Sequence, residues 1–338
     1  MQISLSPRRV TSALPLLLPG LALAAAIALV ARSAASASEV GWLSPMILAV
    51  LLGMGLNRAL GAPAWAQPGL ALAMRPLLRL GVMLLGLQLS LAQLGALGLS
   101  GLLVVALCLA ATFVFTLAFG RLLGVDPALT ELIAAGTSIC GASAVVAANT
   151  VTRAREEDVA YAISIVTLFG TVAMLVFPML QRVIELSPAG YGLWIGASVH
   201  EVAQVVAAGF QGGSDAGEFA TISKLARVML LAPVVLVLGR LALRRRGAGS
   251  DTPVPAVPWF VAGFIALMLV NSLVAIPEQA AQATRAATSF LLTAALAAVG
   301  MQTDLAKLVS RGGRPLLLGF AAFLFIGTLA LGLAAIAV

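Results

Sequence analysis

The sequence predicts an all-α membrane protein with about 9–11 transmembrane segments. Of its 338 residues, 61% are hydrophobic and 10% are charged, and the mean hydropathy is +1.07. Soluble domains, by comparison, are roughly 45–50% apolar and about 25% charged. The apolar residues fall in runs of about 16–25, close to the ~20 residues that a helix needs to cross a bilayer. The chain is therefore expected to cross the membrane many times.

Eleven apolar segments follow one another along the chain, separated by short polar loops. The longest polar connection, 244–258, is too short for a folded domain, so we expect residues 1–338 to form a single polytopic transmembrane domain. In chain order the expected segments are 14–31, 44–60, 76–94, 97–121, 130–150, 159–180, 190–210, 221–243, 256–275, 286–304 and 315–337.

The first segment has two interpretations. Arg8 and Arg9 precede the apolar run Leu14–Val30, and small residues follow it, as in a secretory signal peptide. Two prolines within this run are compatible with a retained first helix as well. We prefer a retained helix within residues 1–31, and in either case the next loop is expected outside.

The Lys and Arg residues predict the orientation, because cytoplasmic loops carry an excess of them. With a cytoplasmic N-terminus and eleven spans, the inside loops hold 14 of these residues and the outside loops hold 6. If 130–150 and 190–210 instead re-enter from opposite sides, the counts become 15 and 5. Both arrangements predict a cytoplasmic N-terminus and a C-terminus outside, and the counts do not separate eleven spans from nine.

Segment 130–150 is unusual because it is rich in Gly, Ser, Thr and Ala. Gly136 and Gly141 permit unwinding and close approach of the backbone. Irregular backbone at membrane depth is tolerated only where it is buried in protein or lines a cavity. The alternative is a small-residue face for helix packing. On the first interpretation, the side chains that would bind a substrate or ion are Thr137, Ser138, Ser143 and Asn149.

An internal repeat indicates an inverted architecture. The stretch GLQLSLAQL at 86–94 matches GMQTDLAKL at 300–308 at five of nine positions. Each stretch places a glutamine, Gln88 or Gln302, near the end of an apolar segment, and the two segments are expected to point in opposite directions. Many secondary transporters are built from inverted repeats. Chance similarity between two Leu- and Ala-rich stretches is the alternative.

The stretch GASVHEVAQVVAAG at 196–209 contains the only histidine, His200, followed by Glu201 and, one helical turn later, by Gln204. A charged group at the bilayer centre costs roughly 2.5–3.5 kcal/mol on insertion scales, so such groups face a cavity or pair with each other. On a helix, His200 and Gln204 would share a face and Glu201 would lie about 100° away, which suits two walls of a binding site. The alternative is an interhelical hydrogen-bond cluster.

The same stretch is similar to the zinc-protease pattern H-E-x-x-H, but Gln204 stands where the second histidine is needed. No metal site is therefore expected. Cys108 and Cys140 lie within apolar segments and are expected to be free thiols.

Lys224 and Arg227 lie at the start of the expected segment 221–243. They are interpreted either as side chains that extend to the membrane interface or as cations that attract an anionic substrate. The net charge of +7 is spread over short loops rather than gathered in a basic domain, so nucleic acid is not expected as a partner.

Several of these motifs resemble those of a known family. GTSICGASAVVAANTV at 136–151, HEVAQVVAAG at 200–209, KLARV at 224–228 and the repeated glutamine stretches are together similar to the bacterial PSE family of multi-pass inner-membrane proteins, named as sulfate exporters. The resemblance covers most of the chain. It implies a location in the bacterial inner membrane and export of sulfate or a small sulfonate-like anion. It also implies kinship in fold with inverted-repeat transporters of the bile-acid-symporter type.

The sequence as a whole predicts a secondary transporter of a small anion, coupled to a proton or a sodium ion, and not an enzyme. No G-x-x-x-x-G-K-[ST] nucleotide-binding motif occurs, so the energy is expected to come from an ion gradient or from the substrate's own gradient. His200 and Glu201 would form a proton-responsive pair, and Ser138, Ser143, Asn149 and Gln204 would hold substrate or ion. An intramembrane enzyme and a channel are the alternatives. The expected partners are the lipid bilayer, the anion and its coupling ion; no cofactor is expected, and a homodimer is left open.

Overall fold

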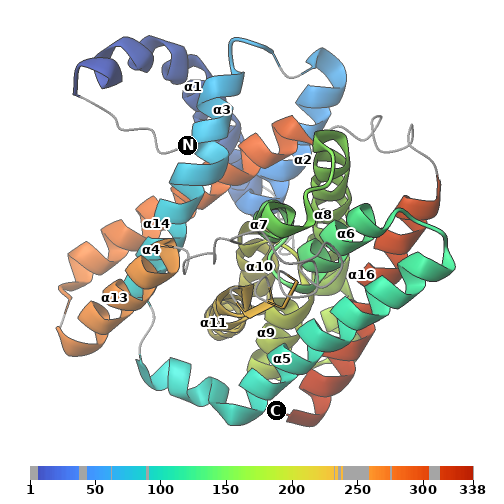
Figure 1. The fold of residues 1–338 in the computed structure, drawn as a ribbon. Helices are drawn as coiled ribbons and strands as arrows, with labels where there is room; N and C mark the ends of the chain where they lie inside the picture. The colour runs from blue at the N-terminus through green and yellow to red at the C-terminus, as the bar shows by residue number, and fades with distance from the viewer. Residues whose placement is uncertain are drawn as a thin grey trace. The chain divides into compact units, whose positions relative to one another are not determined.

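The computed structural model describes residues 7–37, 44–61, 63–88, 91–231, 233–234, 237–238, 259–274, 276–303 and 313–337. Throughout these residues the regular elements are helices (Figure 1). The chain groups into two compact units, unit 1 with residues 1–88 and 275–304, and unit 2 with residues 89–274 and 305–338. Each unit is described by itself, and the expected single polytopic domain stays a prediction.

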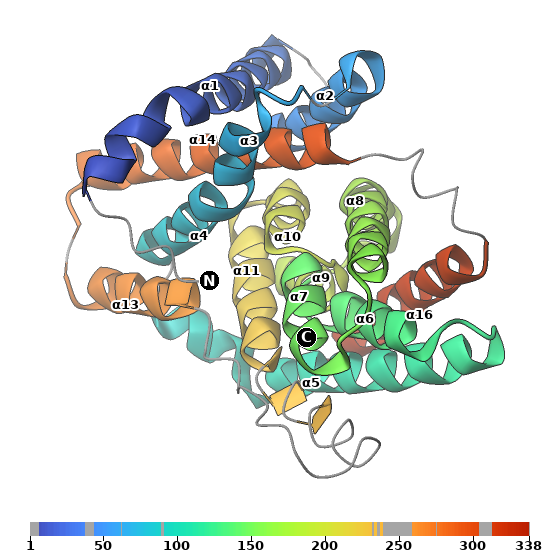
Figure 2. The same ribbon diagram turned by 45° about the horizontal axis from the view of Figure 1, so that its top comes forward.

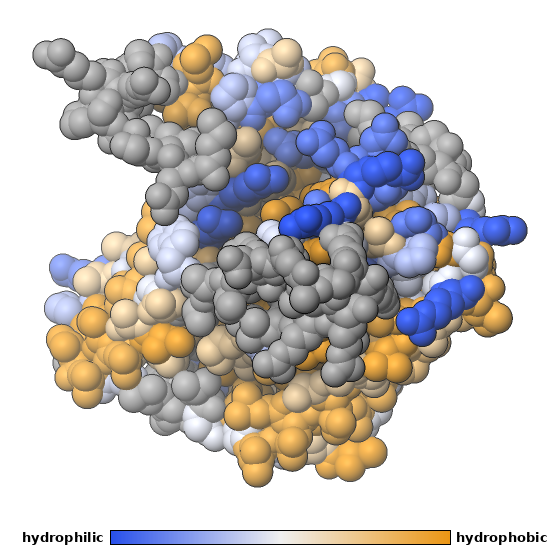
Figure 3. Space-filling model, viewed as in Figure 1, coloured by the Kyte–Doolittle hydropathy of each residue, from blue (hydrophilic) through white to orange (hydrophobic). Residues whose placement is uncertain are grey.

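Six helices among the described residues are long and apolar enough to cross a membrane. Large apolar side chains are exposed along two of them in unit 2, such as Leu99 at 74% and Val114 at 65% on α5 (Leu91–Leu122), and Ile336 at 86% on α16 (Gly313–Ala337). Apolar residues cover the lower part of the face in Figure 3, where these two helices lie. The all-α membrane fold is thereby confirmed. The six helices cover 15–37, 67–88, 97–122, 156–184, 278–302 and 313–337.

In unit 1, one continuous helical segment includes a π-helical turn. That turn, η1, contains Pro76 and does not end the helix. The segment predicted at 76–94 therefore begins at Gln67 instead. The elements of unit 1 are α1 (Pro7–Ala37), α2 (Pro45–Leu60), α3 (Gln67–Leu72), η1 (Ala73–Leu77), α4 (Leu78–Leu85), the 3-10 turn η2 (Gly86–Gln88) and α14 (Glu278–Gln302).

The segment from α3 to α4 crosses α14 obliquely (Figure 2), and the two run in opposite chain directions. Ala73 belongs to one core cluster with Ala297 and Met301, whereas Gly81, further along the segment, faces Leu292. Gln88 and Gln302 therefore end oppositely directed helices, as expected. The inverted repeat itself stays a prediction, because 89–90 and 304–308 lie outside the described residues.

Unit 2 is built around two short helical hairpins. Hairpin 1 consists of α6 (Pro127–Ser138) and α7 (Ala142–Thr152), and hairpin 2 consists of α9 (Pro188–Ser198) and α10 (Val202–Gly209). The remaining elements of unit 2 are α5, α8 (Glu156–Ile184), the 3-10 turn η3 (Phe210–Gly212), α11 (Ser214–Met229), α13 (Trp259–Leu273) and α16.

Hydrogen bonds between the outer ends of each hairpin show that both segments turn back. In hairpin 1 the Thr152 hydroxyl donates to the Glu131 carboxylate at 2.9 Å. In hairpin 2 the Tyr191 hydroxyl donates to the Ala208 carbonyl at 2.9 Å. With 12 and 11 residues, α6 and α9 are about 18 and 16 Å long, roughly half of the ~30 Å hydrocarbon core.

The two hairpins enter unit 2 from opposite ends. Between them lies α8, whose 29 residues extend about 43 Å and carry the chain from one end of the unit to the other. At one end of unit 2, which we call the Arg314 end, α5 ends and α6, α8 and α16 begin. At the other end, which we call the Tyr191 end, α8 ends, α9 begins, and the last turns of α16 approach Gly190. Segments 130–150 and 190–210 therefore each fold as a hairpin that turns back within unit 2, as the nine-span alternative predicts; their re-entry into a membrane stays a prediction.

Candidate functional site

The turns that join the halves of the two hairpins, 139–141 and 199–201, meet inside unit 2; we refer to them as the tips. Gly141 has a φ of +69°, a left-handed conformation that glycine adopts without strain. A side chain at Gly141 would also collide with Glu201, whose Cγ lies 2.5 Å from the position a Cβ would take. The tip of hairpin 1 is therefore in direct contact with that of hairpin 2.

Lys224 and Arg227 of α11 bind the carbonyl groups at the tips. Lys224 Nζ donates to the carbonyl oxygens of Ile139 and Val199, both at 2.8 Å. The side chains of Lys224 and Arg227 are fully buried, at 0% exposure. The interpretation that they extend to the membrane interface is therefore wrong. The Arg227 guanidinium donates to the backbone carbonyl oxygens of Ser138 at 2.6 Å, Ala197 at 2.9 Å and Val199 at 3.1 Å, and also to that of Thr137.

The electrostatic effect of this arrangement is favourable at both hairpins. The last carbonyls of a helix have no partner within the helix, and the C-terminal end carries partial negative charge. The cations of α11 lie at the C-terminal ends of α6 and α9, so they satisfy these carbonyls and complement both dipoles.

Glu201 occupies the opposite kind of helix end. Its carboxylate accepts a hydrogen bond from the Gln204 backbone N–H at the start of α10, and one from the Ala142 backbone N–H at the start of α7. The Thr167 hydroxyl of α8 donates to the same carboxylate at 3.0 Å. A carboxylate is stabilised by the free N–H groups and the positive end of a helix dipole. One acidic side chain thus caps the outgoing helices of both hairpins.

Gln204 fastens the tip of hairpin 2 to α8. Its amide oxygen accepts from the Glu201 N–H at 3.1 Å, and its amide nitrogen donates to the Thr167 carbonyl and the Thr171 hydroxyl, both at 3.2 Å. The close approach requires glycine at position 170, since a Cβ there would lie 2.0 Å from Gln204 Oε1. Both amide N–H groups are used within the protein, so Gln204 positions the tip.

His200 lies between these two sets of capping contacts. It is fully buried, at 0% exposure, and neither ring nitrogen has a hydrogen-bond partner among the described residues. Its ring centroid lies 6.5 Å from that of Phe323 on α16. The hydroxyls of Thr137, Ser138 and Ser223 are likewise buried without a partner in the described part of the chain. Unsatisfied buried polar groups are costly, so each of these four side chains is available to form a hydrogen bond with a polar ligand.

Other residues predicted for the site lie elsewhere. Ser143 is exposed near the start of α7. Asn149 lies near the outer end of hairpin 1, where its side-chain oxygen accepts from the Ala154 N–H at 2.7 Å. Gln88 and Gln302 belong to unit 1. The structure therefore brings together Thr137, Ser138, His200, Glu201, Gln204, Lys224 and Arg227.

Three residues of α8 were missed by the sequence analysis: Thr167, Gly170 and Thr171. They occur as TLFGT within an apolar span. Small residues at this spacing are common in membrane helices for packing alone, so the sequence carried little signal for their contacts with Glu201 and Gln204.

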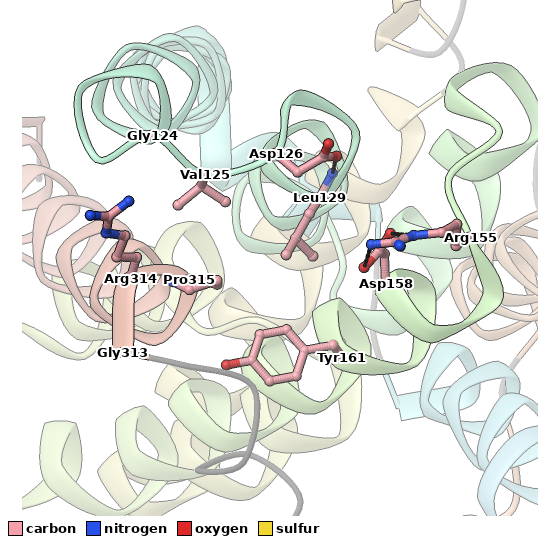
Figure 4. Close-up of a pocket in the computed structure, with 10 residues that line it drawn as sticks. All are labelled: Gly124, Val125, Asp126, Leu129, Arg155, Asp158, Tyr161, Gly313, Arg314 and Pro315. Carbon is pink, nitrogen blue, oxygen red and sulfur yellow. Dashed lines mark hydrogen bonds and ion pairs between the residues drawn. The ribbon is translucent and has the colours of Figure 1, made fainter.

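A pocket of about 530 Å³ lies at the Arg314 end of unit 2 (Figure 4). Arg155 pairs with Asp158 there at 3.0 Å, and the hydrogen bond to Asp158 raises the pKa of Arg155. Asp126 caps the first N–H groups of α6. None of the residues that line this pocket belongs to the tips, and the Arg155 side chain is 77% exposed. The tips, where charges are buried and held by broken helices, are the stronger candidate for the site.

Among the described residues, no group of three or more His, Cys, Asp and Glu side chains is placed to hold a metal ion. The side chains at the tips can form hydrogen bonds, carry fixed charge and exchange protons at His200 and Glu201.

Comparison with known proteins identifies the family. The family model described as conserved hypothetical protein 698 matches residues 19–319. The UPF0324 inner membrane protein YeiH of Escherichia coli K12 is 38% identical over 314 residues, with 90% of each chain covered. A UPF0324 membrane protein of Corynebacterium glutamicum is 39% identical over 293 residues, covering 85% of this chain and 84% of the relative. One from Pseudomonas aeruginosa is 39% identical over 324 residues, covering 91% and 90%.

No solved structure matches the chain. The names of the relatives state a membrane location and no substrate. They confirm the resemblance of the motifs to a bacterial family of multi-pass inner-membrane proteins. The chain belongs to the UPF0324 family of membrane proteins.

Proposed function

We propose that this protein is a secondary transporter of a small anion and that the tips of the two hairpins are its binding site. The observation that carries the proposal is the meeting of two half-length hairpins, from opposite ends of unit 2, at two buried cations and one carboxylate. Secondary transporters commonly place substrate and coupling-ion sites where discontinuous helices meet near the bilayer midplane. A sulfate-like or sulfonate-like substrate is proposed from the resemblance of the motifs.

The charges at the tips favour an anion. Lys224 and Arg227 contribute two positive charges against the one negative charge of Glu201, and His200 is neutral in its ordinary form at pH 7. At an effective dielectric constant near 20, two unit charges about 4 Å apart interact by about 4 kcal/mol. A bound anion would balance the remaining positive charge. The hydroxyls of Thr137, Ser138 and Ser223 would then donate to its oxygen atoms.

His200 and Glu201 are proposed as the proton-responsive groups. Glu201 is anchored by donors from α7, α8 and α10, so its role is to hold the tips while its charge is present. His200 has no such anchor among the described residues. A change of its protonation would alter the charge next to a bound anion without breaking an existing hydrogen bond.

The orientation follows the positive-inside rule. Among the described residues of unit 2, Arg121, Arg153, Arg155 and Arg314 lie at the Arg314 end and Arg182 lies at the Tyr191 end. We propose that the Arg314 end faces the cytoplasm. Hairpin 1 would then enter from the cytoplasm and hairpin 2 from the periplasm, and α16 would end in the periplasm.

The test is flux of labelled sulfate and small sulfonates into proteoliposomes under an imposed pH gradient. The decisive comparison is between Ser138→Ala at the tips and Ser164→Ala on α8, where the hydroxyl only bonds the Ala160 carbonyl of its own helix. Loss of a hydrogen bond to a charged ligand costs about 1.5–3 kcal/mol, so Ser138→Ala should raise the apparent KM roughly 10- to 100-fold. The proposal fails if no anion in the set moves, or if the two variants transport alike.

A further inference from the structure

Five backbone carbonyls from the two hairpins converge on Lys224 and Arg227. They belong to the last turns of α6 and α9 and to the tips that follow them. In transporters with discontinuous helices, unwound carbonyls and the C-terminal ends of half-helices are the groups that coordinate a coupling sodium ion. Hard cations prefer such oxygen ligands. In this protein the same kind of oxygen cage is filled by nitrogen donors of the chain itself.

The donors use the lone pairs that a metal cation would need. The Val199 carbonyl accepts from both Lys224 at 2.8 Å and Arg227 at 3.1 Å, which occupies both of its lone pairs. Ile139 accepts from Lys224, and the other three carbonyls accept from Arg227. The nearby Glu201 carboxylate is taken up by N–H and hydroxyl donors from three helices.

We infer that Lys224 and Arg227 are built-in substitutes for a coupling sodium ion, so that sodium neither binds at the tips nor drives transport. Two fixed, fully buried positive charges repel a further cation from the same oxygen cage. Both cations are covalently part of α11, so neither can leave during a transport cycle as a bound ion does. The inference rests on the proposed function only where it concerns transport; the statement about sodium binding does not depend on it.

The experiment compares wild type, Lys224→Ala and Lys224→Met in detergent, each titrated with NaCl against N-methylglucamine chloride at constant ionic strength. Lys224→Ala removes the charge and opens space beside the Ile139 and Val199 carbonyls. Lys224→Met removes the same charge but keeps the stem in place, so it is the matched control without space for an ion. We expect a sodium-specific rise in melting temperature of about 2–4 °C for Lys224→Ala, and none for Lys224→Met or wild type. Binding of radioactive sodium should follow the same order.

A sodium-specific stabilisation of the wild type overturns the inference, and so does a folded Lys224→Ala variant that responds to sodium no more than Lys224→Met. If Lys224→Ala does not fold, the wild-type titration alone decides, since the inference requires it to be flat. Anion flux in proteoliposomes separates the two proposals. Flux that requires sodium refutes the inference and leaves transport standing, whereas flux unchanged without sodium supports both. Absence of flux for every anion refutes the proposed function, and the melting data still decide about sodium.

Discussion

Replacement of Arg227 by methionine measures how much of the stability of unit 2 depends on the capped tips. The guanidinium donates to four carbonyls. Val199 keeps its bond from Lys224, so three carbonyls, those of Thr137, Ser138 and Ala197, lose their only donor among the described residues. A buried polar group left without a partner costs about 1–3 kcal/mol.

The total loss in the free energy of unfolding is smaller than the sum of this cost over the three carbonyls, because the tips relax and the buried charge itself is removed. We therefore expect a loss of about 3–5 kcal/mol, the cost typical of breaking a buried charged contact. For a unit of this size, that loss should lower the melting temperature by roughly 6–20 °C. Flux should be lost as well, since the tips would no longer hold their shape.

The measurement is the melting temperature in detergent of Arg227→Met and of Arg285→Met. The second variant makes the same chemical change on α14, where Arg285 is 54% exposed and pairs with Glu278 at 2.8 Å. Exposed pairs contribute about 0.2–1 kcal/mol, so the control should melt close to wild type. Equal melting temperatures for the two variants would refute the role assigned to the Arg227 contacts.

Three further predictions concern the hairpins and the orientation. Gly170→Ala should destabilise the protein by about 1–3 kcal/mol, because the new Cβ displaces the Gln204 amide from its partners. The control Gly55→Ala has open space around it, so it should be neutral or stabilise the protein by about 1 kcal/mol. Equal melting temperatures of the two variants would contradict this. His200→Gln should reduce pH-driven flux with little change in melting temperature, since the His200 ring makes no hydrogen bond within the described residues. Glu201→Gln should reduce both the flux and the melting temperature. Normal flux in both variants would remove these residues from the mechanism. A reporter enzyme that is active only outside the cytoplasm should be active when fused to the C-terminus, and activity of a cytoplasm-dependent reporter at that position would reverse the proposed orientation.

The membrane fold was predictable because it depends on quantities that every residue contributes to. Hydropathy summed over some twenty residues identifies a helix in lipid whatever its neighbours are. The first hairpin also left a local signal, since Gly141 permits the backbone conformation of its tip. For this reason the sequence predicts irregular backbone within 130–150.

The second tip carried no comparable signal. The buried cations of α11 bond the Val199 carbonyl. Val199 and Glu201 have extended backbone conformations, and no glycine or proline lies at 199–201 to mark the break. The expectation that His200, Glu201 and Gln204 share one continuous helix was wrong for this reason. A local sign was present, however, because Glu201 and Gln204 have the spacing of a capping box at a helix start.

The role of Lys224 and Arg227 could not be predicted from side-chain patterns. Their partners are backbone carbonyls 25 to 90 residues earlier in the chain. A carbonyl acceptor is present in every residue type, so the partner positions carry no signature in the sequence. Two cations near the start of an expected apolar segment are therefore as compatible with the membrane interface as with the centre of the protein.

The dependence of both tips on α11 has a consequence for how the protein is made. The carbonyl of Ile139 is synthesised 85 residues before Lys224, which binds it. At about 5–20 residues per second, that interval lasts about 4–17 s. During this time the Ile139 carbonyl lacks its Lys224 donor, and lipid cannot satisfy it, so we expect hairpin 1 to wait at the membrane surface or inside the insertion machinery. We thus expect hairpin 1 to complete its insertion only when α11 arrives, and a ribosome stalled before Lys224 to leave a chain whose first hairpin has no stable place in the bilayer.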